Sequence, residues 1–228
     1  CFQMKVNQLH SLPEEEAGPR LQLKRVARKL IAERGVHDVS VREIALAADQ
    51  RNLGVVAYYF GTKDKLVADI LIDGAARIEA RRQVYLDAME AEGGPKTLTD
   101  AVKAIVLPSA SFADDDEIYG NYFNRFILQV SYYKSGFIDE TLDGRWNTGY
   151  QRCLTHFRRL MPHLTQAEQS RRYVFFASYI GLLLAQRESM RADDTKSHPT
   201  WTSNETLLDI VQTATALLDA PILKDDQA

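Results

Sequence analysis

The stretch from Ser40 to Leu66 carries side chains suited to hydrogen bonding along a DNA duplex. Arg42 has a guanidinium long enough to donate to O6 and N7 of guanine, whereas Tyr58, Tyr59 and Lys63 carry donors suited to phosphate. Small residues between them would let a helix approach base edges and thymine methyl groups closely. The stretch therefore predicts a DNA-reading unit. The residues expected to contact DNA are Ser40, Arg42, Arg51, Asn52, Gly54, Val55, Ala57, Tyr58, Tyr59 and Lys63.

Local signals place these side chains on two short helices and on the start of a third. Ser40 is a good N-cap, and Glu43 three residues later completes a capping box. The polar run 49–52 breaks the apolar spacing, so it predicts a turn, with Asn52 as the N-cap of the second helix. The residues at the inward spacing of that helix are Leu53, Val56 and Phe60. The residues expected on its opposite face are Gly54, Val55, Ala57 and Tyr58.

Three segments together resemble the TetR family of helix-turn-helix transcriptional repressors. They are the amphipathic helix of residues 19–35, the helix start at 39–45, and the run from Tyr58 to Leu66. Asp49 stands where the family usually has Gly, and Arg51 and Asn52 resemble a subgroup with one extra residue before the recognition helix. The resemblance implies an all-α fold, a palindromic double-stranded DNA operator, a small-molecule effector and a homodimer.

The charge of the chain is divided unevenly along its length. Residues 19–66 carry ten Lys/Arg against five Asp/Glu, whereas residues 67–228 carry 17 against 23. Such an asymmetry is expected when one small domain approaches a polyanion, although a solvated charged helix face would give it too. The predicted organisation is an N-terminal extension (1–18), a helix-turn-helix domain (19–66) and a domain for effector binding and dimerisation (67–228).

The rest of the chain predicts helices separated by short joints, without an alternating strand pattern. The longest nearly apolar run, 173–185, is too short to span a bilayer, and no signal peptide opens the chain. We therefore expect a cytoplasmic, all-α protein with no membrane partner. The helices expected after the second short helix cover 63 to about 92, 97 to about 110, 118–133, 142–161, 166 to about 192, and 202–218, the last with a capping box of Thr202 and Glu205.

The helix from Gln166 is apolar nearly all round between Tyr173 and Leu184, so we expect another element to cover its second face. Two such helices from each of two chains would make a four-helix bundle, although both could instead complete one core. The residues expected at a two-fold interface are Tyr179, Leu183, Ile210, Val211, Ala214 and Leu218.

Aromatic side chains are dense in the middle helices, where they could form plain core or line a cavity. Polar side chains in the same helices would allow an apolar pocket with a few orienting hydrogen bonds. The family resemblance implies that such a pocket holds the effector. The residues expected to line it are Phe126, Gln129, Trp146, Tyr150 and Tyr173.

Signals for catalysis, metal binding or a cofactor are weak. His156 and His163 lack a nearby carboxylate at ligand spacing, so no metal is expected, and Cys1 and Cys153 cannot build a disulfide framework. We find no phosphate loop, nucleophile elbow or paired-carboxylate motif, and we expect a regulator that is not an enzyme and needs no cofactor. The alternative is a helical-bundle enzyme or adaptor with a vestigial helix-turn-helix, which should lack salt-sensitive, sequence-specific DNA binding.

Overall fold

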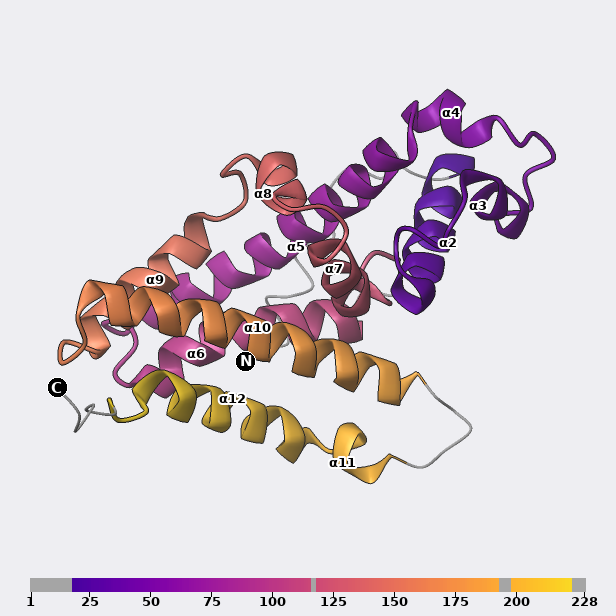
Figure 1. Cartoon of the computed structure of the whole chain (residues 1–228). Coiled ribbons are helices and arrows are strands. Elements are labelled where there is room, and N and C mark those ends of the chain that lie inside the picture. Colours follow the sequence, from indigo (N-terminus) through magenta and orange to yellow (C-terminus); the bar gives the residue numbers. More distant parts are fainter. Residues whose placement is uncertain (1–17, 116–117, 193–197, 223–228) are drawn as a thin grey trace, which may run out of the picture.

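The computed structural model describes residues 18–115, 118–192 and 198–222, and the elements of this part of the chain are helices, as the sequence predicts. Figure 1 shows α2, α3 and α4 gathered at one end, which we call the head, and the later helices in an elongated body. The helices are α2 (Pro19–Arg34), α3 (Val41–Ala47), α4 (Val55–Phe60), α5 (Lys63–Ala91), α6 (Leu98–Asp115), α7 (Phe123–Ser131), α8 (Phe137–Leu142), α9 (Thr148–Leu160), α10 (Gln166–Arg191), α11 (Pro199–Thr202) and α12 (Asn204–Asp219).

The long helix α5 connects the head to the far end of the body (Figure 1). The hydroxyl of Thr62 caps its start by accepting a hydrogen bond from the amide of Lys65 at 3.1 Å. Gly93 and Gly94 follow its end with φ angles of 92° and 80°, a backbone region that L side chains rarely adopt. The predicted extent of this helix, from Lys63 to about Glu92, is confirmed.

Two apolar cores hold the helices together. The first lies between α2, α3, α4 and the first turns of α5, and it is completed by Phe112 of α6 and by Phe123, Phe126 and Val130 of α7. The second lies between the far half of α5 and helices α6, α9, α10 and α12. Since residues of α6 and α7 belong to the first core, the head is packed against the body.

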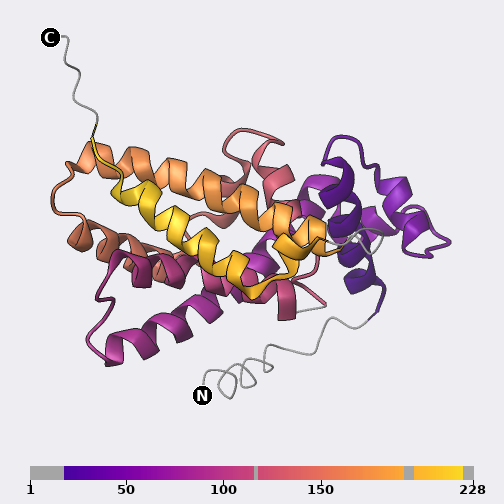
Figure 2. The same ribbon diagram turned by 90° about the horizontal axis from the view of Figure 1, so that it is seen from below.

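Helices α10 and α12 run side by side in opposite directions along one edge of the body (Figures 1 and 2). Thr165 and Glu168 form a capping box at the start of α10, and this helix covers the predicted range. The C-terminal end of α12 is capped by Arg172 of α10, because the guanidinium of Arg172 donates to the carbonyls of Leu218 and Ala220.

The single helix predicted over 142–161 is wrong, because the structure divides that region into α8 and α9. Asp143, Gly144 and Trp146 between them have φ angles of 46°, 68° and 52°, so the backbone is left-handed there and cannot continue a right-handed helix. The apolar spacing continues across the break, and for this reason the sequence pattern conceals it.

Other boundaries also differ from the sequence prediction. Helix α6 continues through Pro108 to Asp115, beyond the predicted end near residue 110, and α7 is shorter than the predicted 118–133. Helix α12 begins after Ser203, whose hydroxyl accepts from the amide of Glu205, so the cap lies one residue later than the predicted Thr202. Among the described helices, none combines the length and the low polarity that crossing a membrane requires.

Candidate nucleic-acid interface

The exposed face of the head is formed by α3, the following turn and α4. Ser40 caps α3: its hydroxyl accepts from the amide of Glu43 at 3.2 Å, while the Glu43 carboxylate accepts from the amide of Ser40 at 2.8 Å. The predicted capping box is therefore confirmed. The predicted contact residues on this exposed face are Ser40, Arg42, Arg51, Asn52, Gly54, Ala57, Tyr58 and Tyr59.

The two tyrosines of α4 differ in their environment. Tyr58 is 80% exposed, whereas Tyr59 is 36% exposed, and their ring centroids lie 4.9 Å apart in an edge-to-face arrangement. This contact restricts the positions that the two phenol hydroxyls can take, and both hydroxyls can donate to a phosphate oxygen.

Val55 does not belong to the exposed face, and its predicted contact with DNA is wrong. Its side chain is 7% exposed and lies in the first core with Val56 and Phe60, whereas Leu53, predicted to turn inward, is 38% exposed. The physical reason is the late start of α4, whose N-cap is Gly54 and not Asn52. Leu53 therefore lies before the helix, where helical spacing does not apply, and the buried side chains of the helix are Val55, Val56 and Phe60.

The turn between α3 and α4 depends on two short polar side chains. Asp49 has a φ angle of 54°, in the left-handed region where glycine is most easily accommodated. Asn52 accepts a hydrogen bond from the amide of Gly54 through its side-chain oxygen at 2.9 Å, which is a local turn and not a helix cap. Together they place Arg51 at the exposed tip of the turn.

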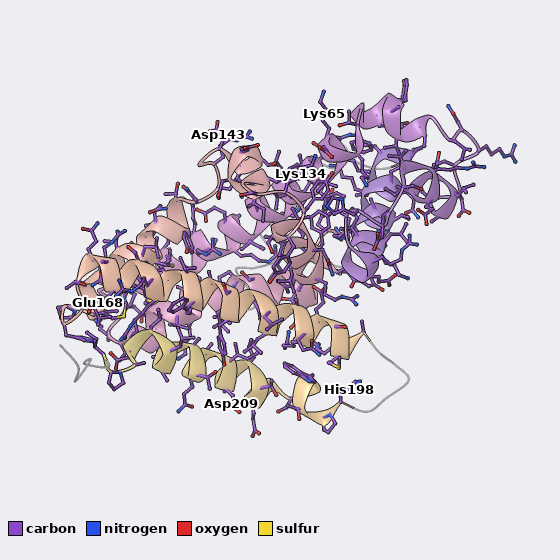
Figure 3. The ribbon with its side chains drawn as sticks, in the orientation of Figure 1. Lys65, Lys134, Asp143, Glu168, His198 and Asp209 are labelled. Carbon is purple, nitrogen blue, oxygen red and sulfur yellow. The ribbon has the colours of Figure 1, made fainter. Side chains whose placement is uncertain are left out.

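The side chain of Lys63, predicted to contact a phosphate, is engaged within the head. Its ammonium donates to the carbonyls of Val36 and Val39 at 2.8 and 3.0 Å, so it fixes the start of α5 to the segment between α2 and α3. Two of its three hydrogens are therefore used inside the head, and the side chain is half-buried. The exposed Lys65, which Figure 3 labels beside α4, is better placed for a phosphate.

The electrostatics of the exposed face are set by Glu43 and Arg34. Hydrogen bonds from the amide and hydroxyl of Ser40 and from Arg34 lower the pKa of Glu43 to about 2. Arg34 donates to the same carboxylate at 3.0 Å. Because Glu43 is engaged in this way, the neighbouring Arg42 remains available to a ligand on the exposed side.

Ion pairs between α2 and α5 hold the head in place. Lys24 is 3% exposed, and its ammonium contacts the carboxylates of Asp73 at 2.8 Å and Asp69 at 3.6 Å. Arg20 also binds Asp69, and its guanidinium lies 5.3 Å from the ring centroid of Phe60. Arg20 and Lys24 therefore hold α2 against α5 and are not part of the exposed face of α3 and α4.

The structure does not bring the predicted effector residues together. Phe126 is fully buried in the first core, and Gln129 lies beside Gly35 of the head. Tyr150 and Tyr173 pack against the second core, and Trp146 lies in the loop before α9 with Arg145 4.6 Å from its ring centroid.

Two surface hollows adjoin the head. One, of about 320 Å³, lies between α2 and the segment before α7, and includes Arg25, Lys29 and Tyr122 in its wall. The other, of about 300 Å³, lies between α2, α7 and α10, and Gln129 is the only predicted effector residue in its wall. Trp146, Tyr150 and Tyr173 line neither hollow.

The predicted position at a dimer interface is wrong for most of the six residues, because they face the core of their own chain. Ile210, Val211, Ala214 and Leu218 are between 0 and 4% exposed and fill the second core of their own chain. Tyr179 and Leu183 are half-buried against the same core, and the Tyr179 hydroxyl lies 2.6 Å from that of Thr213.

A second apolar stripe on these helices is exposed instead. Its members are Val174, Phe175, Leu182 and Leu208, which are between 55 and 63% exposed. We call these four residues the outer stripe. The spacing of 175 and 182 on α10 is a helical repeat that the sequence contains, but it cannot be distinguished from the inner stripe where the helix is apolar nearly all round.

Comparisons with known proteins agree with this architecture. Residues 24–70 match a family profile described as bacterial regulatory proteins, tetR family, and residues 103–216 match one described as tetracyclin repressor-like, C-terminal domain. No curated protein matches the sequence.

Two solved structures show the extent of the structural likeness. A protein from Pseudomonas aeruginosa PAO1, assigned as a transcriptional regulator, is 18% identical, with 92% of each chain covered and a TM-score of 0.55, which supports a shared fold. GusR of Salmonella enterica is 17% identical over 90% of this chain and 98% of its own, with a TM-score of 0.38, too low to support a structural argument.

Proposed function

This chain belongs to the TetR family of bacterial regulatory proteins and is a DNA-binding transcriptional regulator, and we propose that it is a repressor released by a small-molecule effector. In this proposal, a homodimer binds a palindromic operator in the cytoplasm, where the chromosome lies. The single observation that carries the proposal is the exposed face of α3 and α4, which places a free guanidinium, small residues and two phenol hydroxyls on one surface of the head.

The roles within this face follow from side-chain chemistry. Arg42 donates to guanine, and Gly54 and Ala57 allow the backbone to approach thymine. Tyr58 and Tyr59 hold phosphates on either side, as do donors at the tip of the turn. We assign Lys63 to positioning the head, because its ammonium is bound to two carbonyls, and Lys65 to a phosphate.

A second copy of the chain is the proposed occupant of the outer stripe. A single recognition helix reads only a few base pairs, so a palindrome requires two heads related by a two-fold axis. Phe175 and Leu208, exposed on adjacent antiparallel helices, provide an apolar surface of the kind that forms a four-helix bundle. Burying each such side chain contributes roughly 1.5–3 kcal/mol.

The effector is proposed to be a largely apolar or aromatic molecule that enters beside Tyr150 and Tyr173. These two side chains are half-buried against Phe157, whose ring centroid lies 5.8 Å from that of Tyr173. Phe126 is too deeply packed to meet a ligand without rearrangement of the first core. A ligand that binds one arrangement of the body better than another shifts the DNA-competent population by its differential affinity.

The DNA-binding part is tested by selecting bound sequences from random DNA with the full chain. We expect enrichment of a two-fold symmetric site with affinity about 10³-fold or more above that for scrambled DNA, and a steep loss of affinity as salt rises. A helical enzyme or adaptor with a vestigial head would give no enriched sequence, which would refute the assignment.

The effector part is tested by screening small molecules for a rise in melting temperature and then measuring operator affinity with each stabilising compound. We expect stabilisation and weaker operator binding to occur together, and Tyr150→Ala to blunt both. Tyr132→Ala is the matched control, because Tyr132 is 80% exposed and lies outside the second core. A stabilising ligand that left operator affinity unchanged would contradict the coupling.

A further inference from the structure

Helix α7 lies between the head and α10, and the first residues of this helix are capped by α10. Its own N-cap residue, Tyr122, has a φ angle of 65° and provides no side-chain cap. The carboxylate of Glu188 on α10 provides it instead, accepting from the amide of Asn124 at 2.9 Å and from the amide of Arg125 at 3.2 Å. Two unpaired amides at a helix start are thus satisfied by a residue more than 60 positions later in the chain.

This contact is buried and charge-assisted. The side chain of Glu188 is 8% exposed, and the guanidinium nitrogen Nε of Arg125 lies 3.3 Å from it. Burial raises the pKa of Glu188, while the amides of Asn124 and Arg125 and the Arg125 charge oppose the rise. A buried carboxylate is tolerated only where such partners replace water, so the position of α7 relative to α10 is narrowly defined.

The segment before α7 holds the head directly. Arg28 of α2 is 4% exposed, and its two terminal nitrogens donate to the carbonyls of Ile118 and Tyr119 at 2.7 and 2.6 Å. Within α7, Phe126 and Val130 complete the first core against the head. Helix α7 therefore contacts α2 along its length.

The other end of α7 holds the start of α5. The hydroxyl of Tyr133 donates to Asp64 at 2.8 Å, and the ammonium of Lys134 lies 2.5 Å from the other oxygen of the same carboxylate. Asp64 is the second residue of α5 and follows Lys63, which fixes that helix to the head. Figure 3 shows Lys134 near the start of α5.

The C-terminal part of α10 is itself anchored to the body. Arg187 forms two parallel hydrogen bonds with Asp114 of α6, at 2.9 and 2.8 Å. The same helix carries Phe175 and Leu182 of the outer stripe. A continuous series of contacts therefore connects α10, which carries the proposed dimer surface, through Glu188 and α7 to α2 and to the start of α5.

We propose that Glu188 is a positioning residue for DNA reading, which fixes α7 and thereby sets the distance between the two heads of a dimer. This inference rests on the proposed function. Half-sites one turn apart are separated by about 34–36 Å, and one added base pair moves a half-site by about 3.4 Å and rotates it by about a tenth of a turn. A head whose position is fixed by these contacts binds DNA poorly when the half-site spacing changes. A head that has lost the contact of Glu188 with α7 can move to accommodate the new spacing.

The test is a series of operators in which the selected half-sites are moved apart or together by one base pair at a time. Wild-type chain should bind one spacing best and lose about tenfold or more at the neighbouring spacing, in line with coupling energies that correspond to about 5- to 150-fold. Glu188→Ala should reduce this loss to about threefold or less, because neither amide is then capped. Glu188→Gln should fall between them, since one carboxamide oxygen can accept from only part of the donor set.

Glu168→Gln is the matched control. Glu168 is also a capping carboxylate on α10, but it caps α10 itself, accepting from the amide of Thr165 at 2.7 Å. This variant should show the same dependence of affinity on half-site spacing as the wild type, which we call the spacing profile, even if it lowers the melting temperature. A purely structural role for Glu188 would likewise change the melting temperature and not the profile.

A wild-type spacing profile in a folded Glu188→Ala chain would overturn the proposal. If that variant does not fold, Arg28→Met carries the test from the head side, because it removes the donors to Ile118 and Tyr119, and it should flatten the profile in the same way. An unchanged profile there would be equally decisive. If the wild-type chain bound no sequence preferentially, the proposed function would fail, which is a different result from a retained profile.

Discussion

Gly74 lies where α5 passes α7, and its replacement by alanine is expected to disrupt the junction between head and body. A methyl carbon added at Gly74 would lie 2.0 and 2.1 Å from two ring carbons of Phe123, far inside van der Waals contact. Phe123 cannot move freely, because it is 1% exposed and its ring centroid lies 5.2 Å from that of Phe112 and 5.9 Å from that of Phe126.

The expected magnitude follows from two opposing effects. Replacing glycine by alanine inside a helix normally stabilises by about 1 kcal/mol, so a stabilised variant would be the expectation from sequence alone. Overpacking a core costs about 1–3 kcal/mol, and loss of a buried phenylalanine costs about 3–5 kcal/mol. We therefore expect Gly74→Ala to lower the free energy of unfolding by about 2 kcal/mol or more.

The assay is urea denaturation followed by circular dichroism at one protein concentration, because dimerisation makes stability concentration-dependent. Phe123→Leu should rescue the variant in part, since leucine lacks the two ring carbons that clash. Gly181→Ala on α10 is the matched control, because among the described residues an added methyl there meets nothing within 4 Å beyond its chain neighbours and the backbone of its own helix. A Gly74→Ala chain as stable as wild type, or a Phe123→Leu change with the same cost in both backgrounds, would refute this reasoning.

Three further outcomes follow from the structure. The pKa of Glu43 is lowered to about 2, so the ionised carboxylate stabilises the fold fully above its ordinary pKa of 4.5, and this stabilisation is lost as the pH falls from 4.5 to about 2. The urea midpoint should therefore fall less steeply with acid in Glu43→Gln than in wild type. Burial raises the pKa of the Cys153 thiol to about 12. In a Cys1→Ser background, iodoacetamide at pH 8 should therefore modify Cys153 only after unfolding. Rapid modification of the folded chain would contradict the burial of Cys153. Leu208→Glu should give folded monomers by sedimentation, because Leu208 is 57% exposed and belongs to the proposed dimer surface. Val211→Glu should instead unfold the chain, because Val211 is 1% exposed in the core. Folded Val211→Glu monomers would support the interface predicted from the sequence.

Local hydrogen-bonding signals in the sequence were sufficient to predict the start of α3, and the start of α10, predicted without reference to a cap, carries a capping box as well. Ser40 with Glu43 and Thr165 with Glu168 each satisfy two amides through side chains three residues apart, so the cap forms wherever the fold places it. The break between α8 and α9 has no capping box, and its one local signal is the turn dipeptide of Asp143 and Gly144, which the prediction of a single helix passed over because the apolar spacing continues across it. Aspartate adopts the left-handed conformation more readily than most residues, whereas Trp146 in that conformation is uncommon and requires support from the rest of the structure.

The sequence also could not decide which stripe of an apolar helix faces inward. Val211 and Leu208 lie three residues apart on α12, and only the packing against α6 and α10 makes the first a core residue and the second an exposed one. The same limit applies to Val55, because the prediction counted Leu53 as an inward residue of a helix that begins only after it. The series of contacts through Glu188 joins residues too distant in the chain for any local pattern to predict.

The central claim, that the exposed face of α3 and α4 reads base sequence, is tested most directly by the affinity of Arg42→Ala for the selected operator and for every single-base variant of it. We predict a loss of about 1–3 kcal/mol per head on the operator and a loss of discrimination at one position in each half-site. Arg158→Ala, which removes an exposed arginine of α9 in the body, should match wild type at every position. An Arg42→Ala chain that discriminates all positions as well as wild type does would contradict the claim.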